Sequence, residues 1–584
     1  MEQFRSAQDL DYLHALRHSG AHLMAQAVTR LYPEAQLTVG PVIEDGFFYD
    51  IDLQGKTLSP EDLPAIENEM RKIVKENFKL SYSEKSRDDA KSYLKTQNQP
   101  YKIELIDSFP GDEAISFYQQ GEFIDLCEGP HIRSTGELKH FKLLKISGAY
   151  WKGNDKGPVL QRIYGTVFPT KEALDAHLKM LEEAKKRDHR ELGQRLDLFS
   201  FHEWAPGSPV FHPHGTLVYN QMIDFVRELY KKYDYHEVMT PQLFDSKLYA
   251  LSGHLQSFRE DMFEFKEGEE HSAYLKPMNC PGHCLFYRSK LFSYRELPLR
   301  IAEFSRLHRN ELAGALHGIT RVRSFAQDDA HIFCMDEQVD DEIDRFFEFV
   351  DEVYAAFNLG AYSMKLALRP EKRLGSDEIW NRAEKKLEDA LKRRGVPYEL
   401  KPGEGGFYGP KYEFHIKDAI GRPWQLATLQ LDYNFPERFE LEYVGKDSKR
   451  HRPVMLHRAA FGTIERFLGV YLEHCEGYFP TWLAPVQVVL VPVRENHFEA
   501  TKEMEKQFVA QGLRVQSDLA EGNMGGKVRK ATVARVPYFA VVGDKEIETR
   551  SLAIKTSRGE NLGTIPMAQF IDRLKSEIAT RGLK

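Results

Sequence analysis

Two pairs of side chains near the N-terminus are of the types that bind metals or activate water. His18 and His22 lie four residues apart in a helical pattern, and Cys127 and His131 are four apart in the segment DLCEGPH. Residues four apart in a helix share one face. Three imidazoles and a thiol suit a zinc site as well as a hydrolytic site, so the residues alone leave both open. The helical pair is equally compatible with an ordinary surface or core position.

Two clusters of arginines suit the binding of phosphate. In the first, two strand-like runs flank a polar loop; Arg309 and Glu311 leave one run, and Arg321 enters the other. In the second, HRAAFGTIERFLGVYLEH, Arg466 lies within a helical pattern. Converging guanidinium groups bind phosphate through paired hydrogen bonds. Either cluster alone is compatible with solvated surface arginines, and their combination is what favours a phosphate site.

Cys280, His331 and His457 are potential metal ligands that are far apart in the chain. The first two are 51 residues apart and the last two 126, counted from their residue numbers. No spacing of this kind indicates a metal site by itself, and each residue is compatible with core packing.

Several segments together resemble the threonyl-tRNA synthetases, a family of class II aminoacyl-tRNA synthetases. They are KPMNCPGHC, LHRNE, SFAQDDAHIFC, FYGPKYEF, and VMLHRA followed by ERF, and they occur in the family's order over nearly the whole chain. The resemblance implies a catalytic antiparallel sheet of six or more strands flanked by helices. It also implies threonine, ATP with Mg²⁺, and tRNA(Thr) as substrates, and a homodimer formed through motif 1, the segment ending at Pro241. Motif 2 matches 300–334 and motif 3 matches 457–474.

The same resemblance assigns roles to the two arginine clusters. Arg309 would hold the α-phosphate and the threonine carboxylate, and Glu311 would face the adenine. Arg321 and Arg466 would bind the outer phosphates. Preorganised guanidinium groups with Mg²⁺ neutralise charge that develops as the carboxylate attacks the α-phosphorus, so the reaction needs no protein nucleophile.

By resemblance, Cys280, His331 and His457 bind one zinc ion per chain. Threonine and valine have nearly the same shape, and a hydrophobic pocket gains only about 1–3 kcal/mol from such small differences. A zinc ion that binds both the amino nitrogen and the hydroxyl makes the hydroxyl obligatory. The remaining thiols, Cys284 and Cys334, are assigned to the core together with His283.

The resemblance also implies four residues of a threonine pocket. Asp329 would accept the hydroxyl proton of the substrate, and Gln327, Tyr408 and Gln425 would line the pocket.

At the N-terminus the matching family feature is an editing domain that clears serine from tRNA, shared by the threonyl and alanyl enzymes. The alanyl type holds zinc there, whereas the threonyl type is expected to use a water molecule held by the side chains. The implied site comprises His18, His22, Cys127, His131 and Asp125, with Tyr49 and Lys102 as further candidates. Whether this site ever holds a metal is left open. Because the HSGAH pattern arrives by residue 18, the resemblance also implies a chain without the small domain that precedes it in many relatives.

The local patterns predict the elements that must position these residues. At 584 residues the chain is long enough for three or four domains. Residues 1–170 combine a helical pattern at 9–31 with Gly- and Pro-punctuated strands, which predicts an α+β editing domain. Strong helix formers at 171–198 predict an exposed linking helix. The catalytic domain is expected at 199–482, and alternating strands and helices at 483–584 predict a small α/β domain with a largely parallel sheet.

The C-terminal hundred residues are the most basic part of the chain. Residues 485–584 hold 16 Lys and Arg against 12 Asp and Glu, so they carry +4 in a chain of net charge −8. They resemble the family's anticodon-binding domain, in which Glu546 and Lys555 match base-contacting positions. The loop at 518–527 departs from the family pattern, and Lys555 stands where relatives often have Arg. The anticodon contacts of this chain therefore need not match those of the family.

Composition excludes several classes of protein. No stretch reaches the roughly 18 apolar residues that a membrane span needs. Five cysteines are too few for a disulfide framework, and the first residues lack an apolar signal segment, which favours a cytoplasmic protein. Two rival functions remain, a non-catalytic RNA-binding paralogue and a free-standing deacylase. Neither requires the complete set of motif arginines and ligands that this sequence has.

Overall fold

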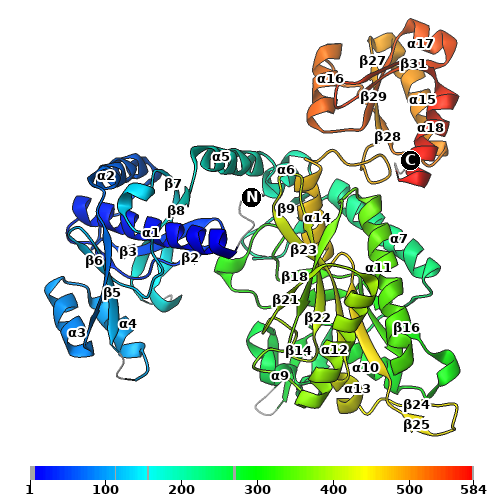
Figure 1. Ribbon diagram of the computed structural model, residues 1–584. Helices are drawn as coiled ribbons and strands as arrows, with labels where there is room; N and C mark the ends of the chain where they lie inside the picture. Colours follow the sequence, from blue (N-terminus) through cyan, green and yellow to red (C-terminus); the bar gives the residue numbers. More distant parts are fainter. Residues whose placement is uncertain (1–6, 112–113, 154–156, 268–270, 582–584) are drawn as a thin grey trace. The chain divides into compact units, whose positions relative to one another are not determined.

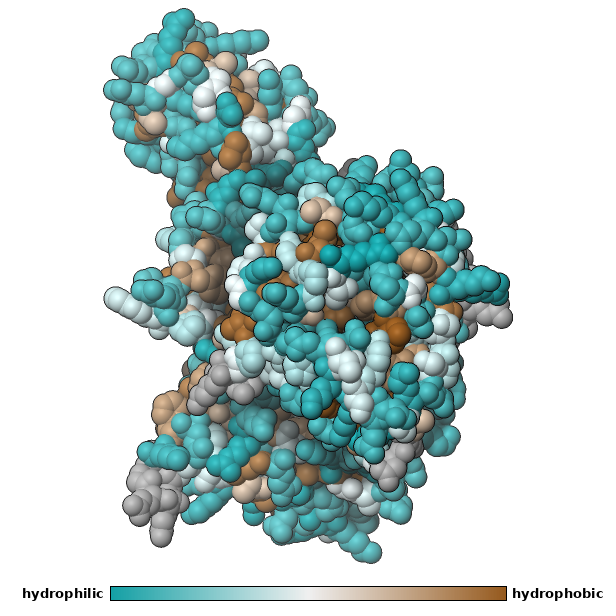
Figure 2. Space-filling model, turned by 90° about the vertical axis from the view of Figure 1, so that its left-hand side faces the viewer, coloured by the Kyte–Doolittle hydropathy of each residue, from teal (hydrophilic) through white to brown (hydrophobic). Residues whose placement is uncertain are grey.

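A computed structural model describes residues 7–111, 114–153, 157–267 and 271–581 (Figure 1). The chain forms two compact units, Met1–Glu183 and Ala184–Lys584. Each unit has its own hydrophobic core. Among the described residues, no helix is long and apolar enough to cross a bilayer. Hydrophilic residues cover most of the face seen in Figure 2, and the apolar residues on it lie in small scattered groups.

The first unit packs two helices against an antiparallel sheet. Helix α1 (Ala7–Leu31) and helix α2 (Leu63–Glu76) bury their apolar faces in one core. The sheet they cover has the order β1-β3-β8-β7, with β2 paired to β3. These strands are β1 (Gln36–Leu37), β2 (Val42–Ile43), β3 (Gly46–Asp52), β7 (His140–Tyr150) and β8 (Val159–Phe168).

A second, smaller sheet in this unit carries part of the histidine and cysteine site. Its antiparallel order is β4-β5-β6, formed by Leu80–Lys85, Ile115–Gln120 and Phe123–Leu126. Helices α3 (Arg87–Thr96) and α4 (Pro100–Ser108) follow β4, and a small core forms between α3, α4 and β5. Strand β6 ends at Leu126, so Cys127 leaves the sheet at the edge of this layer.

The segment predicted as one exposed linking helix is two helices, so that prediction is wrong in part. Helix α5 (Lys171–Lys186) ends where α6 (His189–Arg195) begins. Asp188 causes the break, because its carboxylate accepts a 2.8 Å hydrogen bond from the Arg190 N–H and caps α6. The second helix is also not exposed, since His189 and Leu192 on it are buried.

The second unit is built on an eight-stranded sheet, which confirms the predicted class II architecture. Its order is β11-β16-β19-β26-β23-β22-β20-β21, with parallel pairing only at the two edges. In that order the strands are His236–Glu237, Leu299–Glu303, Asp329–Cys334, Val454–Ala459, Pro423–Asp432, Lys411–Lys417, Tyr362–Ala367 and Tyr398–Lys401. The second strand-like run, which Arg321 enters, forms two short strands, β18 and β19, instead of one. Residues 324–326 form β18, paired to β17 (Arg306–His308), and the preceding residues form a turn.

The two faces of this sheet pack against different helices. Alternate residues of β19 and β26, such as Ile332 and Leu456, join the core formed with α7 (Pro213–Lys232), α11 (Val339–Ala356) and α14 (Ile464–His474). Their neighbours Phe333 and Met455 join the core formed with α10 (Cys280–Arg288) and α13 (Asn434–Arg438). Because side chains alternate along a strand, one face of the sheet packs against α7, α11 and α14. The other face, covered by α10 and α13, holds the candidate site.

The C-terminal sheet is mixed, so the prediction of a largely parallel sheet is only half right. Its order is β28-β27-β29-β30-β31, and only the first three strands are parallel. The last two strands, Ser551–Thr556 and Asn561–Pro566, are joined by a short turn, which permits only antiparallel pairing. The other strands are β27 (Val488–Pro492), β28 (Val515–Ser517) and β29 (Tyr538–Val542). The helices are α15 (Phe498–Ala510), α16 (Met524–Val533), α17 (Asp544–Thr549) and α18 (Met567–Thr580).

A buried ion pair joins the strands at the centre of the catalytic sheet. Arg458 of β26 donates to the Asp328 carboxylate at 3.2 Å and to its carbonyl at 3.0 Å. The same carboxylate accepts the N–H groups of Ala460 and Phe461, which lead from β26 toward α14. The guanidinium carbon of Arg458 also lies 4.1 Å from the ring centre of Tyr235.

Replacing Arg458 with Met should lower the free energy of unfolding of this unit by about 3 kcal/mol or more, because Asp328 would become a buried charge without its partner. Urea unfolding measures the change. The double variant Asp328→Asn, Arg458→Met should recover part of the loss. Arg393→Met, on the exposed face of α12 (Asp377–Arg394), is the control. A loss no larger than that of the control would show that the pair does not hold the sheet together.

Candidate functional sites

Two histidines of the larger unit face each other across neighbouring strands. His331 of β19 is directly opposite His457 of β26, which in turn is opposite Gln430 of β23. Opposed residues in a sheet lie on the same face with their side chains in contact. One row of the sheet therefore carries both imidazoles, although 126 positions separate them in the chain.

Cys280 joins these histidines from the first residue of helix α10. Its sulfur lies 3.3 Å from Nδ1 of His457, and one ligand atom each of Cys280, His331 and His457 lies within 4.8 Å of the others. All three residues are buried. Nε2 of His331 is buried and has no hydrogen-bond partner among the described residues. One thiol and two imidazoles, with one nitrogen left unsatisfied, fit the donor set of a zinc ion with an open position.

Acidic residues and a third histidine hold the two imidazoles in place. Nε2 of His457 lies 2.9 Å from the Asp432 carboxylate. Nδ1 of His331 lies 2.7 Å from Nδ1 of His283, whose Nε2 lies 3.1 Å from Glu303. Partners of this kind orient metal-binding histidines and fix their tautomers. His283 was assigned to the core from sequence; its position three residues after Cys280 on α10 was the available signal.

Burial shifts the pKa of two of the three potential ligands. It raises the pKa of the Cys280 thiol well above its ordinary value and lowers the pKa of His331 well below its own. The imidazole is thus neutral, the form that can donate a lone pair. A bound cation would offset the cost of forming a buried thiolate.

A cavity of about 460 Å³ opens beside these ligands. Six of the residues named from the sequence line it: Cys280, Arg309, Gln327, Asp329, Tyr408 and His457. Asp329 accepts a 3.0 Å hydrogen bond from Asn279.

Gln425 does not line this cavity. The residues of β23 that do are Thr428 and Gln430, and Gln430 accepts a 2.7 Å hydrogen bond from the Tyr408 hydroxyl. A bulge interrupts the pairing of β23 with β22 between Gln425 and Thr428, so the two glutamines lie on different sides of an irregularity. The bulge has no signal in the local sequence pattern.

Of the three arginines in the two clusters, Arg309 and Arg466 are partly buried and Arg321 is exposed. Arg309 follows β17 and places its guanidinium carbon 5.2 Å from the centre of the Phe325 ring. Burial lowers the pKa of Arg309. Arg321 pairs with Glu311 at 2.9 Å, whereas Nε of Arg466 is buried and has no partner within the described part of the chain. Burial, followed by the charge of Arg321, lowers the pKa of Arg466.

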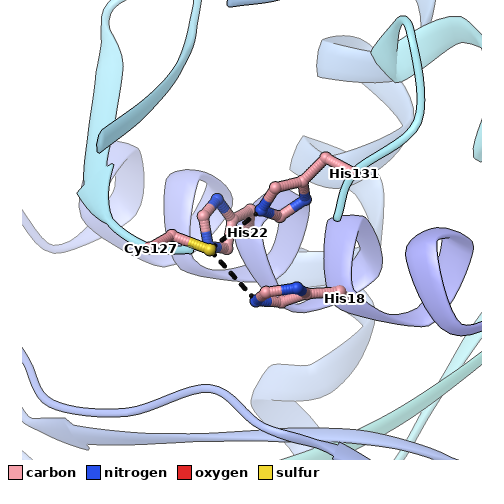
Figure 3. Close-up of side chains that lie close together, drawn as sticks. All are labelled: His18, His22, Cys127 and His131. Carbon is pink, nitrogen blue, oxygen red and sulfur yellow. Dashed lines mark hydrogen bonds between the residues drawn. The ribbon is translucent and has the colours of Figure 1, made fainter. Parts of the chain in front are cut away.

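The first unit brings together the four residues expected at its site (Figure 3). His18 and His22 project from helix α1, and Cys127 and His131 from the segment after β6. The Cys127 sulfur lies 3.3 Å from Nε2 of His18 and 3.1 Å from Nε2 of His131. One ligand atom from each of the four lies within 4.8 Å of the others.

Asp125, Lys102 and Tyr49 form a linked group beside the histidines. The Asp125 carboxylate accepts from Tyr49 at 2.5 Å, lies 2.7 Å from the Lys102 ammonium and lies 3.6 Å from Nε2 of His22. The sequence did not indicate Ser19, whose hydroxyl lies 2.9 Å from Nδ1 of His131. Ser19 is the residue after His18, and only the packing of α1 against the Cys127 loop gives it this contact.

The N-terminal site has neutral imidazoles and a protonated thiol. Burial, with the neighbouring imidazoles, lowers the pKa of His131 to about 2 and lowers that of His18. Burial raises the pKa of Cys127 to about 12. The ring nitrogens of neutral imidazoles can hold a water molecule by hydrogen bonds, whereas a protonated thiol is a poor nucleophile. The site opens into a cavity of about 640 Å³.

The two residues expected to contact bases lie on neighbouring elements of the C-terminal sheet. The Glu546 carboxylate accepts the Gly543 N–H at 3.1 Å and so closes the first turn of α17. Lys555 is exposed on β30, the strand after that helix. The divergent segment 518–527 comprises the residues before helix α16 and the first residues of that helix. Its Glu521 is exposed.

Three protein families match successive parts of the chain. Residues 263–475 match the "tRNA synthetase class II core domain (G, H, P, S and T)". Residues 487–577 match an anticodon-binding domain, and residues 115–164 match the "Threonyl and Alanyl tRNA synthetase second additional domain".

Full-length relatives and solved structures agree with these matches. A threonine–tRNA ligase of Carboxydothermus hydrogenoformans is 50% identical, over 96% of this chain and 88% of its own. That of Thermotoga neapolitana is 47% identical, over 100% of this chain and 91% of its own. A threonyl-tRNA synthetase structure from Cryptosporidium parvum has a TM-score of 0.64 at 38% identity, covering 67% of this chain and 98% of that one. A prolyl-tRNA synthetase from the same organism, 17% identical with a TM-score of 0.54, covers 67% of this chain and 75% of its own and shares the fold. Because relatives 47% to 50% identical match it over nearly its full length, this chain belongs to the threonine–tRNA ligase family.

Proposed function

We propose that this protein activates threonine with ATP, transfers it to tRNA(Thr), and hydrolyses seryl-tRNA(Thr) at its N-terminal site. The observation that carries the proposal is the convergence of Cys280, His331 and His457 beside a cavity that Arg309 also lines. An RNA-binding paralogue or a free-standing deacylase would need neither the ligand set nor the arginines.

In the first step a threonine carboxylate oxygen attacks the α-phosphorus of ATP. A bond forms between that oxygen and phosphorus, the bond to the bridging oxygen breaks, and pyrophosphate leaves with its electron pair. Arg309 would bind the α-phosphate and the carboxylate, and Arg321 and Arg466 would bind the outer phosphates that Mg²⁺ accompanies. Desolvated guanidinium groups stabilise the charge of the transition state more strongly than hydrated ones.

Threonine would lie in the cavity of Asp329, Gln327 and Tyr408. A zinc ion on Cys280, His331 and His457 would supply a Lewis acid for the amino and hydroxyl groups of threonine. Asp329 would accept the hydroxyl hydrogen, which valine lacks. Gln430, held by Tyr408, adds a polar group to the same wall. Gln425 remains a candidate for a contact outside this cavity.

Serine retains both groups that this pocket recognises and lacks only a methyl. One methyl supplies about 10- to 200-fold discrimination, which leaves a need for a second site. At the N-terminal site, His18, His22 and His131 would hold water and accept its proton as it attacks the ester carbonyl of seryl-tRNA. The ester bond to the ribose then breaks, and the ribose oxygen takes the proton.

The domain assignment follows from these roles. We assign editing to residues 1–170, the connection to 171–198, aminoacylation to 199–482 and anticodon binding, including Glu546 and Lys555, to 483–584. We further propose a cytoplasmic homodimer joined near motif 1, where Met239 is 91% exposed, an unusual state for a large apolar side chain.

Purified protein should carry about one zinc ion per chain, and Cys280→Ser should lose both the zinc and threonine activation. Metal analysis and threonine-dependent ATP–pyrophosphate exchange measure the two. Cys284→Ser is the matched control, because Cys284 is one turn further along α10 and contacts Met455 instead. Full zinc content and activity in Cys280→Ser would refute the metal assignment.

Arg309→Ala and Arg466→Ala should each lower the rate of adenylate formation about 10²- to 10³-fold, since each removes a group that stabilises developing charge. Single-turnover formation of threonyl-adenylate measures this rate. Arg393→Ala, an exposed arginine of α12, should leave it unchanged. Near-normal rates in both active-site variants would exclude a phosphate-binding role.

The double variant His18→Ala, His22→Ala should charge threonine normally and accumulate seryl-tRNA, while valine stays excluded. Hydrolysis of pre-formed seryl-tRNA measures the loss directly. His14→Ala is the matched control, because His14 is exposed one turn earlier on α1. Clearance of seryl-tRNA at the parental rate by the double variant would assign the N-terminal unit another function.

A further inference from the structure

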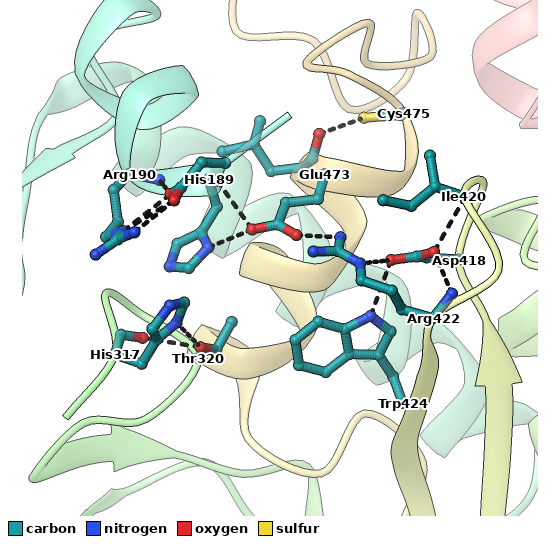
Figure 4. A network of polar contacts seen from close by, with 12 residues as sticks. His189, Arg190, His317, Thr320, Asp418, Ile420, Arg422, Trp424, Glu473 and Cys475 are labelled. Atoms are coloured by element: carbon teal, nitrogen blue, oxygen red, sulfur yellow. Dashed lines mark hydrogen bonds and ion pairs between the residues drawn. The ribbon is translucent and has the colours of Figure 1, made fainter. Parts of the chain in front are cut away.

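His189, at the start of α6, is fully buried and belongs to neither of the sites described above (Figure 4). It contacts both helix α14 and the turn before Arg321. Nδ1 of His189 lies 2.6 Å from the Glu473 carboxylate, near the end of helix α14. The His189 backbone N–H donates to the same oxygen at 3.0 Å. Nε2 of His189 accepts the Ile319 N–H at 3.2 Å. Since Nε2 accepts, the ring carries its proton on Nδ1 and donates it to Glu473.

Ile319 is at the tip of the turn that leads into Arg321. His317 and Arg321 exchange backbone hydrogen bonds of 3.1 and 3.2 Å, which closes the turn. The turn packs so tightly on the histidine that a Cβ added to Gly318 would lie 2.0 Å from Nε2 of His189. Gly318 also has a φ of +49°, in the region that favours glycine. On the other side, a Cβ on Gly469 of α14 would lie 2.8 Å from Cγ2 of Thr320.

The same carboxylate reaches the second phosphate-binding arginine through a chain of contacts. The other oxygen of Glu473 accepts from Arg422, whose Nε donates to Asp418 at 2.6 Å. Asp418 also accepts the Trp424 indole N–H at 3.0 Å. The Trp424 ring lies 5.6 Å from the guanidinium carbon of Arg466. Arg466 and Glu473 are both on α14, two helical turns apart.

We propose that His189 is a positioning residue for ATP binding, which holds the turn before Arg321 against α14 so that Arg321 and Arg466 meet the same polyphosphate. The inference rests on the proposed function, and it extends the site to a residue outside all three class II motifs. His189 touches neither substrate. It fixes the backbone from which Arg321 projects, while Glu473, Arg422 and Trp424 fix the surroundings of Arg466.

Two variants remove the contact from opposite sides. His189→Asn retains a donor near Nδ1 for Glu473 but loses the acceptor for Ile319, and Gly318→Ala pushes the turn away from the ring. Each should raise the KM for ATP in pyrophosphate exchange by about tenfold, the size expected when one buried N–H loses its partner. The KM for threonine and the zinc content should stay within about twofold of the parent, because the threonine cavity is not touched.

A merely structural role predicts a different pattern. General destabilisation lowers the melting temperature and the active fraction, and leaves the ratio of the two KM values unchanged. The double variant His189→Asn, Gly318→Ala supplies a second criterion. Because both changes break the same contact, its increase in the KM for ATP should be smaller than the product of the two single increases. Gln194→Ala, at an exposed position of α6, should alter neither KM.

Two outcomes separate the inference from the function on which it rests. If the parent protein exchanges pyrophosphate with threonine but both variants change the two KM values in parallel or not at all, the positioning role of His189 is wrong. If the parent shows no threonine-dependent exchange, the proposed function itself fails.

Discussion

The antiparallel register of β19 with β26 is the constraint on which the larger unit depends. It sets His331 opposite His457 and, through β23, places Gln430 in the same row. A slip of one residue would turn these side chains into the helix-packed core, because strand residues alternate between faces. The buried Asp328–Arg458 pair ties the strands together at the end of this register and also fixes the backbone leading to α14. One pairing therefore positions potential metal ligands, substrate cavity and phosphate-binding helix together.

The two histidine and cysteine sites have similar side chains in different electrostatic surroundings. In the larger unit, carboxylates lie behind the imidazoles: Asp432 contacts His457, and Glu303 contacts His283, which in turn contacts His331. In the first unit the nearest carboxylate, Asp125, is already paired with Lys102 at 2.7 Å. The first arrangement suits a positively charged ligand, and the second suits neutral histidines acting on water. Residue types alone do not distinguish these cases; the neighbouring charges do.

In the proposed phosphate site, the arginines are surrounded by groups to which we assign no contact with substrate. Arg309 and Arg466 are desolvated, which is costly in the free protein and useful once phosphate oxygens replace water. Aromatic rings, Phe325 and Trp424, lie near these guanidinium groups and occupy space that water would fill. His189 and Glu473 then connect the arginine-bearing elements through hydrogen bonds that are almost completely buried. Rigidity around the arginines is thus built from the packing of segments distant in sequence.

The sequence by itself determined the features that have a local period or a family match. Helical spacing predicted that His18 and His22 share a face of α1, and the family's motifs identified the ligands and arginines that the fold brings together. Tertiary structure alone decided that His283 and Gln430 join the site, that Gln425 lies outside the cavity, and that the linking segment breaks at Asp188 so that His189 becomes buried. Local periodicity carries no information about such contacts, because they depend on strand register, a bulge and the packing of residues more than a hundred positions apart.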